Sequence, residues 1–271
     1  MLSSTSRRLP ERTHDDFGRP PGEMASRQVA SAAQWLARFA HSWLPHEPGN
    51  RHLLMKLDGA RGVLVTAPVV DGLALELTLA DLSLQLLEKG TPSPHRMDIQ
   101  DRTPAHIEAW LLVELLHRAI ERERFSKALP WSTAKLMNGD SEEFTPELLK
   151  DELAAIARGF GLAQQVLAAL ANVAAADIPC SADNLHLAVA MDSKDPAGGT
   201  LVAGLSPGDG VTPQPFFYVA RALPRPGTSA ELLPAVITLG EIEHRGLGAT
   251  QVAEIIMRAA ETAASGSKAA E

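Results

Sequence analysis

The sequence predicts an α+β protein made of two similar halves, each with an antiparallel sheet flanked by helices. Segments with helical periodicity bracket each half. Between them lie short apolar runs separated by Asp-Gly and proline turns, as in hairpins. This order of elements occurs twice in 271 residues. We therefore expect one compact body, with halves at 26–126 and 145–264, a linker at 127–144, and two sheets that pair or pack back to back.

The first half begins with a predicted helix at 29–44, whose apolar residues recur every three or four positions until Pro45 ends it. Residues 52–87 read as short antiparallel strands. A proline-rich loop is expected at 89–104, followed by a helix from Ala105 to Phe125. The side of this helix expected to be buried carries Ile107, Leu111, Leu112, Leu115, Leu116 and Ala119.

The second half begins with a long amphipathic helix, for which Thr145 is the expected N-cap and Pro146 the first helical residue. Phe160 lies in the middle of its apolar stripe. Four strands are predicted after it, and a last helix follows; the expected ranges are 184–191, 200–205, 215–222, 234–239 and, for the helix, 249–262. Residues 1–25 and 265–271 are expected to be disordered tails.

Composition excludes some classes of function. The net charge is −8 and no cluster of Lys and Arg occurs, which argues against nucleic-acid binding. No apolar run reaches the length of a membrane span. The single cysteine, Cys180, cannot form an intramolecular disulfide, so we expect a cytoplasmic protein in which this thiol is buried.

Two short motifs carry a resemblance to a known family. They are "LSPGD" at 205–209 and "PFFYV" at 215–219. With them the chain resembles a large bacterial family of uncharacterised proteins, in which a Ser-Pro-Gly-Asp turn precedes a Tyr-containing strand. The resemblance extends over most of 35–264. It implies an architecture and no established activity.

The sequence departs from that family's pattern just before the turn. Members often carry a His-His-Phe-Asp-Leu-Ala run, where this chain has "DNLHLA" at 183–188. Asp183 and Asn184 would occupy the two histidine places, and His186 the aspartate place. The resemblance thus implies that any activity based on those residues is lost or rearranged here.

Metal and cofactor motifs are missing from the sequence. It has no Cys-x-x-Cys, His-Glu-x-x-His or His-x-His spacing, and no nucleophile elbow or phosphate-binding loop. His41, His46 and His52 are close along the chain, but Pro45 and Pro48 place them in a helix end and a loop. A solvated surface is therefore expected there, and no metal or cofactor is predicted.

One group of residues forms a candidate site. Alternation along strand 184–191 places His186 on a face with small residues, which leaves room beside the ring. Asp209 in the turn, Tyr218 in the next strand and Glu241 in segment 240–246 are expected to approach that face. Such a set suits general acid–base chemistry or recognition of a small polar ligand. The alternative is that His186 and Tyr218 are hydrogen-bonded core groups, Asp209 caps the backbone of its turn, and Glu241 lies in a solvated loop.

These observations favour a cytoplasmic binding or accessory protein, a catalytically silent relative of its family, with a small molecule or a protein as partner. The alternative is an enzyme that uses His186 as acid or base. A closed pocket at His186 that contains Tyr218 and a carboxylate would favour the enzyme.

Overall fold

The computed structural model describes residues 20–191, 201–209, 211–220 and 235–265. In these residues helices and one antiparallel sheet confirm the α+β class. The strands are β1 (Met55–Asp58), β2 (Val63–Val65), β3 (Leu73–Thr78), β4 (Ser83–Glu88), β5 (Thr91–Met97), β6 (Pro179–Cys180), β7 (Leu187–Met191), β8 (Leu201–Ser206), β9 (Phe216–Ala220) and β10 (Ala235–Thr238). The α-helices are α1 (Pro21–Trp43), α2 (Pro104–His117), α3 (Lys150–Ala171), α4 (Leu239–Arg245) and α5 (Ala249–Ser265).

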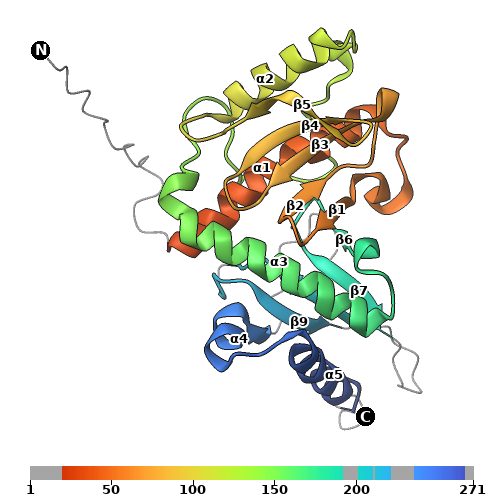
Figure 1. Cartoon of the computed structure of the whole chain (residues 1–271), viewed down its shortest axis with the longest axis vertical. Coiled ribbons are helices and arrows are strands. Elements are labelled where there is room, and N and C mark those ends of the chain that lie inside the picture. The colour runs from red at the N-terminus through yellow and green to blue at the C-terminus, as the bar shows by residue number, and fades with distance from the viewer. Residues whose placement is uncertain (1–19, 192–200, 210, 221–234, 266–271) are drawn as a thin grey trace, which may run out of the picture.

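The ten described strands form one continuous sheet, with the order β10-β9-β8-β7-β6-β1-β2-β3-β4-β5. Each half is a meander of five strands, and the first strand of one half pairs antiparallel with the first strand of the other. Figure 1 shows the orange meander of the first half continuing into the cyan and blue strands of the second. The two expected sheets are therefore joined edge to edge and do not stack. A duplication of the halves stays a prediction.

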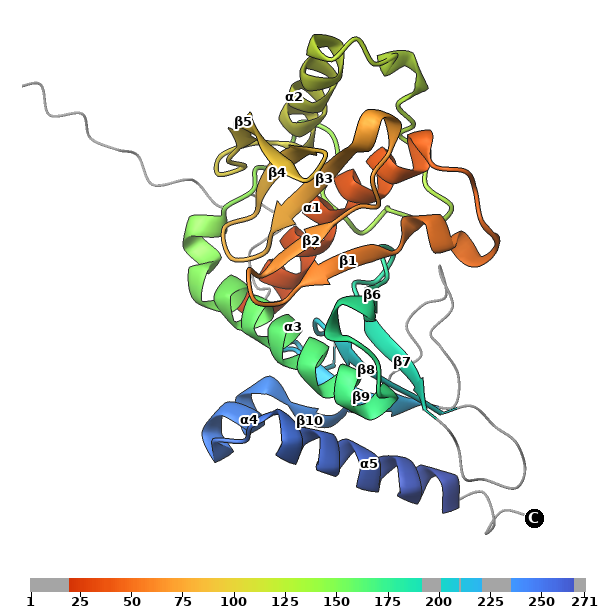
Figure 2. The same ribbon diagram turned by 45° about the vertical axis from the view of Figure 1, so that its right-hand side comes forward.

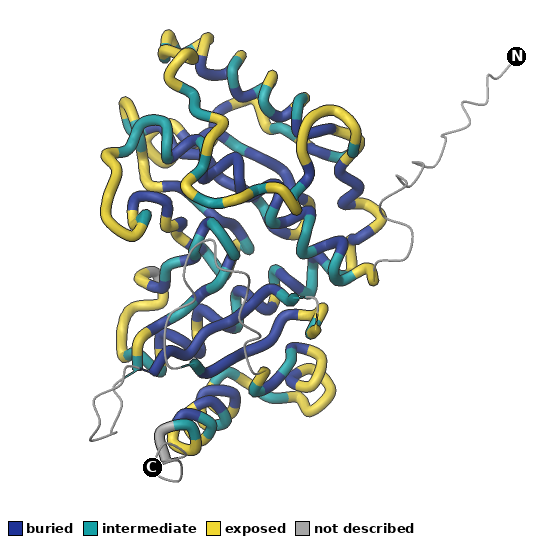
Figure 3. The backbone as a smooth tube through the Cα atoms, turned by 180° about the vertical axis from the view of Figure 1, so that it is seen from behind, coloured by how far each residue is buried: buried dark blue, intermediate teal, exposed yellow. Residues whose placement is uncertain are grey.

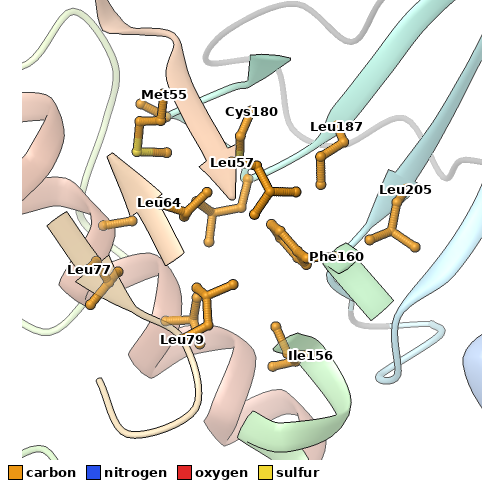
Figure 4. Close-up of a cluster of buried hydrophobic side chains, with 14 of the residues drawn as sticks. Met55, Leu57, Leu64, Leu77, Leu79, Ile156, Phe160, Cys180, Leu187 and Leu205 are labelled. Carbon is orange, nitrogen blue, oxygen red and sulfur yellow. The ribbon is translucent and has the colours of Figure 1, made fainter. Parts of the chain in front are cut away.

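The core lies between the sheet and helices α1 and α3. Helix α1 packs on β3 and α3, and α3 packs on β1, β7 and β8, so α3 crosses the junction of the halves (Figure 2). Phe160 of α3 is fully buried, with Leu57, Leu187 and Leu205 around its ring (Figure 4). The predicted apolar stripe of this helix is thus the side that faces the sheet.

One described helical segment, Pro146–Ala171, has the length and apolar composition of a membrane span. Half of its most apolar stretch is buried inside the protein. Its burial against the sheet is the usual arrangement of a core helix in a soluble protein.

Helix α1 starts earlier than expected. It begins at Pro21, and its first turns bury Met24 and Ala25, so residues 21–25 belong to the fold and not to a tail. This part of the helix packs against the second half, where Ser26 Oγ donates to the carbonyl of Pro207 at 3.0 Å. For residues 1–19 and 266–271, the expected disorder lies outside the described part of the chain.

The predicted loop 89–104 contains the edge strand β5. Pro92 and Pro94 favoured a loop, but an edge strand tolerates prolines because one of its sides has no strand to bond. Helix α2 ends at His117, eight residues before the expected end at Phe125. Phe125 instead stacks on Trp35 of α1, with ring centroids 6.4 Å apart. The expectation that Leu116 is buried is also wrong, since 56% of it is exposed (Figure 3 colours the backbone by burial).

The start of the second half differs in detail. Pro146–Leu149 form a 3-10 turn (η4), and α3 begins at Lys150. Thr145 makes no side-chain cap. Its hydroxyl instead accepts from Gln28 Nε2 of α1 at 2.9 Å, so the residue ties the two halves together.

Candidate functional site

Strand pairing places two of the candidate residues, His186 and Tyr218, on one face of the second half, with Gly204 between them. Leu187 pairs with Leu205, and Gly204 pairs with Tyr218, so His186, Gly204 and Tyr218 project to the same side. This is the face opposite Leu187, Leu205 and Phe217, which join the core beneath α3 and α5. Strand β7 begins at Leu187, later than the expected start at 184, so His186 lies one residue before the strand.

The backbone holds His186 firmly at this position. Its carbonyl accepts from Ser181 N at 2.9 Å, and its N–H donates to Asn184 Oδ1 at 3.0 Å. Leu185 has a φ of 58°, in the left-handed region that most residues avoid. The turn 181–185 thus aims the imidazole across the strands toward β9.

His186 and Tyr218 contact each other as the alternation pattern predicted. Nδ1 of His186 lies 3.3 Å from the phenol oxygen, and the ring centroids are 5.4 Å apart. Tyr218 is fully buried. A Cβ at Gly204 would lie 2.4 Å from the phenol oxygen. The room that small residues leave beside His186 is therefore occupied by the ring of Tyr218.

Burial keeps this pair uncharged. It lowers the pKa of His186 to about 4, while the carboxylate of Asp209 acts in the opposite direction. Burial also raises the pKa of Tyr218 well above its ordinary value. At neutral pH the contact joins a neutral imidazole to a neutral phenol, and either ring nitrogen tautomer satisfies it.

Asp209 lies near this pair and is engaged by its own turn. Its Oδ1 accepts from the backbone N–H of Val211 at 2.8 Å and of Thr212 at 2.7 Å. This confirms the backbone cap expected from the Ser-Pro-Gly-Asp motif. Asp209 therefore acts on His186 through its charge, without a described hydrogen bond between the two side chains.

Glu241 has a local role. The segment 240–246 was expected to be a loop, but Leu239–Arg245 form α4, whose N-cap is Thr238. Oε2 of Glu241 accepts from Thr238 N and from Thr238 Oγ1, both at 2.8 Å. These bonds lower the pKa of Glu241. Among the described residues Glu241 thus belongs to a capping box and makes no contact with His186.

A hollow lies beside the turn that carries His186. Its lining does not include His186 or Tyr218 and consists of Gly49, Asn50, Leu53, Leu54, Trp131, Ser181, Ala182 and Asp183. These residues come from both halves and from the predicted linker. The resemblance placed Asp183 at a family histidine position, which sequence reasoning did not connect with a hollow.

Within the described part of the chain, two groups of side chains bring possible metal ligands together. In each, one ligand atom per residue lies within 4.8 Å of the others; the groups are His41 with His46 and His52, and His95 with Glu114 and His117. The expected solvated surface at 41–52 is wrong for His52, which is buried. Burial lowers the pKa of His41 and of His52, and the neighbouring histidines lower it further. The sequence feature that could have revealed the first group was its three histidines, which are close along the chain and separated by turn residues.

Comparisons with known proteins add no assignment. No protein-family model matches the sequence, and searches of curated proteins and of solved structures found no significant similarity. The resemblance of the two motifs to a family of uncharacterised proteins therefore stays a prediction. The function has to be argued from the geometry of the chain itself.

Proposed function

We propose that the protein is a cytoplasmic binding or accessory protein in which His186 and Tyr218 are structural groups. The observation that carries this proposal is the packing of the pair. The phenol is fully buried, a Cβ at Gly204 would collide with it, and its hydroxyl already meets the imidazole. A general base needs substrate within hydrogen-bond reach. Here Nδ1 of His186 is already occupied by its contact with the hydroxyl of Tyr218.

A small polar molecule is the ligand class that we favour, and the hollow at the junction of the halves supports it. The cavity volume of the hollow is about 20 Å³, room for about one water molecule and far below the roughly 300–1,000 Å³ of sites for drug-sized ligands, so a ligand there would be very small or would insert a single group. Asn50, Ser181 and Asp183 offer polar groups, and Trp131 offers an indole face. Sites at the meeting of two structural units commonly hold ligands. A protein partner is the other possibility.

Thermal shift with a panel of small polar compounds tests this function. A compound that binds the folded state must raise the melting temperature. Leu54 lines the hollow and is 39% exposed, so Leu54→Trp should fill the mouth and abolish the shift. Leu148, 44% exposed and outside the hollow lining, provides the matched Leu148→Trp control. If no compound of the panel shifts the wild type, the small-molecule proposal fails.

An enzyme that uses His186 is the second candidate, supported by its strongly lowered pKa beside a phenol and a carboxylate. The variant His186→Gln separates the two. If the pair is structural, the variant should lose roughly 1–3 kcal/mol of stability because the partners of the ring are left unsatisfied. An unchanged melting temperature with lost ligand binding or lost turnover would favour the enzyme.

A further inference from the structure

The three histidines at the end of α1 are brought together by a built turn. His41 lies in the last turn of α1, His46 in the following loop, and His52 in the 3-10 segment η1 (Pro48–Leu53). Gly49 and Asn50 have φ angles of 68° and 57°, which reverse the chain between His46 and His52. The buried side chains of Leu53 and Met55 then anchor the chain as it enters β1.

The distances within this cluster suit a tetrahedral metal ion. Nδ1 of His41 lies 3.3 Å from Nε2 of His52. Zinc–nitrogen bonds of about 2.0–2.1 Å place two tetrahedral ligand atoms roughly 3.3–3.4 Å apart. The three ring centroids are 4.3, 5.0 and 5.6 Å apart. Rings bound to one such ion have centroids about 5 Å apart. The rings of His41 and His46 are stacked with an interplanar angle of 11°, so they have to tilt apart before all three rings can direct a nitrogen toward a common point.

The donor set selects the class of ion. Three imidazole nitrogens suit zinc, copper or nickel, whereas magnesium and calcium require oxygen ligands. His46 is exposed, which leaves an entry path and a fourth position open to water. We infer that His41, His46 and His52 form a binding site for one divalent transition-metal ion, for which Zn²⁺ is the natural probe. The ion would fasten the end of α1 to the start of the sheet.

Three hydrogen bonds of the cluster have to yield, and the first is the one between His41 Nδ1 and His52 Nε2, since both nitrogens would bind the ion. The backbone N–H of Glu47 donates to His52 Nδ1 at 3.2 Å, so in the neutral ring the proton lies on Nε2, facing His41. When Nε2 binds the ion, that proton moves to Nδ1 and the Glu47 amide turns to solvent, where Glu47 is already exposed. The weak 3.4 Å contact of His46 Nε2 with the His41 carbonyl also opens, if this nitrogen is the ligand.

The second group of possible ligands is a matched comparison. Glu114 is almost fully buried and its carboxylate is already paired, with Arg118 at 2.7 Å and His95 at 2.9 Å. Binding an ion there would compete with the Arg118 charge. His117 is exposed, so His117→Ala removes an imidazole from a helix without disturbing the first cluster.

Calorimetric titration of the chelator-treated full chain with Zn²⁺ tests the site. We expect one ion per chain with a micromolar or tighter dissociation constant. His46→Ala should weaken binding by more than about tenfold, since even partners of ligands commonly contribute that much. His41→Gln should do the same, and His117→Ala should leave the affinity unchanged. Because His46 is exposed, its variant should fold, which circular dichroism verifies.

Co²⁺ provides an independent readout, because tetrahedral Co²⁺ absorbs strongly in visible light and octahedral Co²⁺ weakly. The wild type and His117→Ala should show the intense spectrum, and His46→Ala should not. Absence of stoichiometric Zn²⁺ binding would overturn the inference. So would binding that survives both His46→Ala and His41→Gln, or binding that His117→Ala weakens equally. In those cases the three rings serve only as a hydrogen-bonded cap on α1.

Discussion

At the scale of single residues, Gly204 decides how the candidate site is filled. It pairs with Tyr218 across β8 and β9, and a Cβ there would lie 2.4 Å from the phenol oxygen and 2.6 Å from the carbonyl of Leu187. The carbonyl belongs to the backbone and cannot move aside alone. The glycine therefore permits the fully buried phenol to lie across the strand and reach His186.

Gly204→Ala should destabilise the protein by about 1–3 kcal/mol or more, the usual effect of overpacking a core. Urea denaturation monitored by circular dichroism measures it. Gly248→Ala is the control, because the nearest atom to its Cβ is the end of the Gln251 side chain at 3.3 Å, which can shift. Equal stability of both variants would show that the phenol can move away without loss.

The pKa of His186 predicts a pH dependence of stability. Its folded pKa of about 4 lies below the ordinary 6.5. Between these values the unfolded chain binds a proton that the folded chain excludes, so the free energy of unfolding falls as pH falls from 6.5 to 4. At 1.36 kcal/mol per pKa unit the loss is at most about 3 kcal/mol.

Denaturation of wild type and His186→Gln at pH 7, 6, 5 and 4 measures this contribution. The variant should lose less stability over this range than the wild type does. His244→Gln, a change at an exposed residue of α4, should retain the wild-type slope. Parallel curves for wild type and His186→Gln would show that the imidazole takes up its proton without loss of packing.

At the scale of elements, local patterns predicted what local physics determines. Helical periodicity located α1, α3 and α5, and alternation located β7 to β10 within a few residues. Elements that depend on distant partners escaped. The strand β6 has two residues and exists because it pairs with β1. Helix α4 is different, because its Thr238–Glu241 capping box is a local signal that was taken for a loop.

The same division applies to the candidate site. The contact of His186 with Tyr218 follows from alternation and pairing of neighbouring strands, so the sequence could predict it. The position of Glu241 was missed although its capping box with Thr238 is a local signal, because segment 240–246 was taken for a loop. The histidine cluster depends on two left-handed residues, Gly49 and Asn50, that turn the chain back toward α1.

Helix α3 provides the strongest test at this scale. Phe160 is fully buried where the helix crosses the junction of the halves. Phe160→Ala should therefore cost roughly 3–5 kcal/mol, measured by urea denaturation. Val173→Ala just after the helix, at a residue that is 46% exposed, should change stability by less than about 0.5 kcal/mol. A loss below about 1 kcal/mol for Phe160→Ala would contradict the packing of α3 on the sheet.

At the scale of the whole molecule, the two halves share one core although their sheets meet through a short pairing. Only Met55 with Cys180, and Lys56 with Pro179, form the described ladder between β1 and β6. The other links include the packing of α3 against both meanders and of α1 against α3, and the hydrogen bonds of Gln28 to Thr145 and of Ser26 to Pro207. A half without the other would expose this shared apolar surface. Neither half should then be stable alone.

The chain therefore should unfold in a single cooperative transition, and its aromatic residues allow a direct test. All four tryptophans, at 35, 43, 110 and 131, lie in the first half or the predicted linker, so their fluorescence reports mainly on that part, with Trp131 also sensing the second-half residues beside it. Far-ultraviolet circular dichroism reports both halves. In urea the two signals should give the same midpoint and the same slope. A fluorescence midpoint that lies at a lower or higher urea concentration than the circular dichroism midpoint would mean that the first half folds independently.

Cys180 reports on the junction itself. Its side chain is fully buried in β6, and burial raises the pKa of the thiol, which suppresses the reactive thiolate. If the junction opens only when the whole chain unfolds, labelling of Cys180 by a thiol reagent should be slower than that of a free thiol by the equilibrium constant of global unfolding. Phe160→Ala should then accelerate labelling by the factor that its measured stability loss dictates. Rapid labelling that does not change with this stability loss would show that β6 separates from β1 by a local opening, while the packing of α1 and α3 still holds the two halves together.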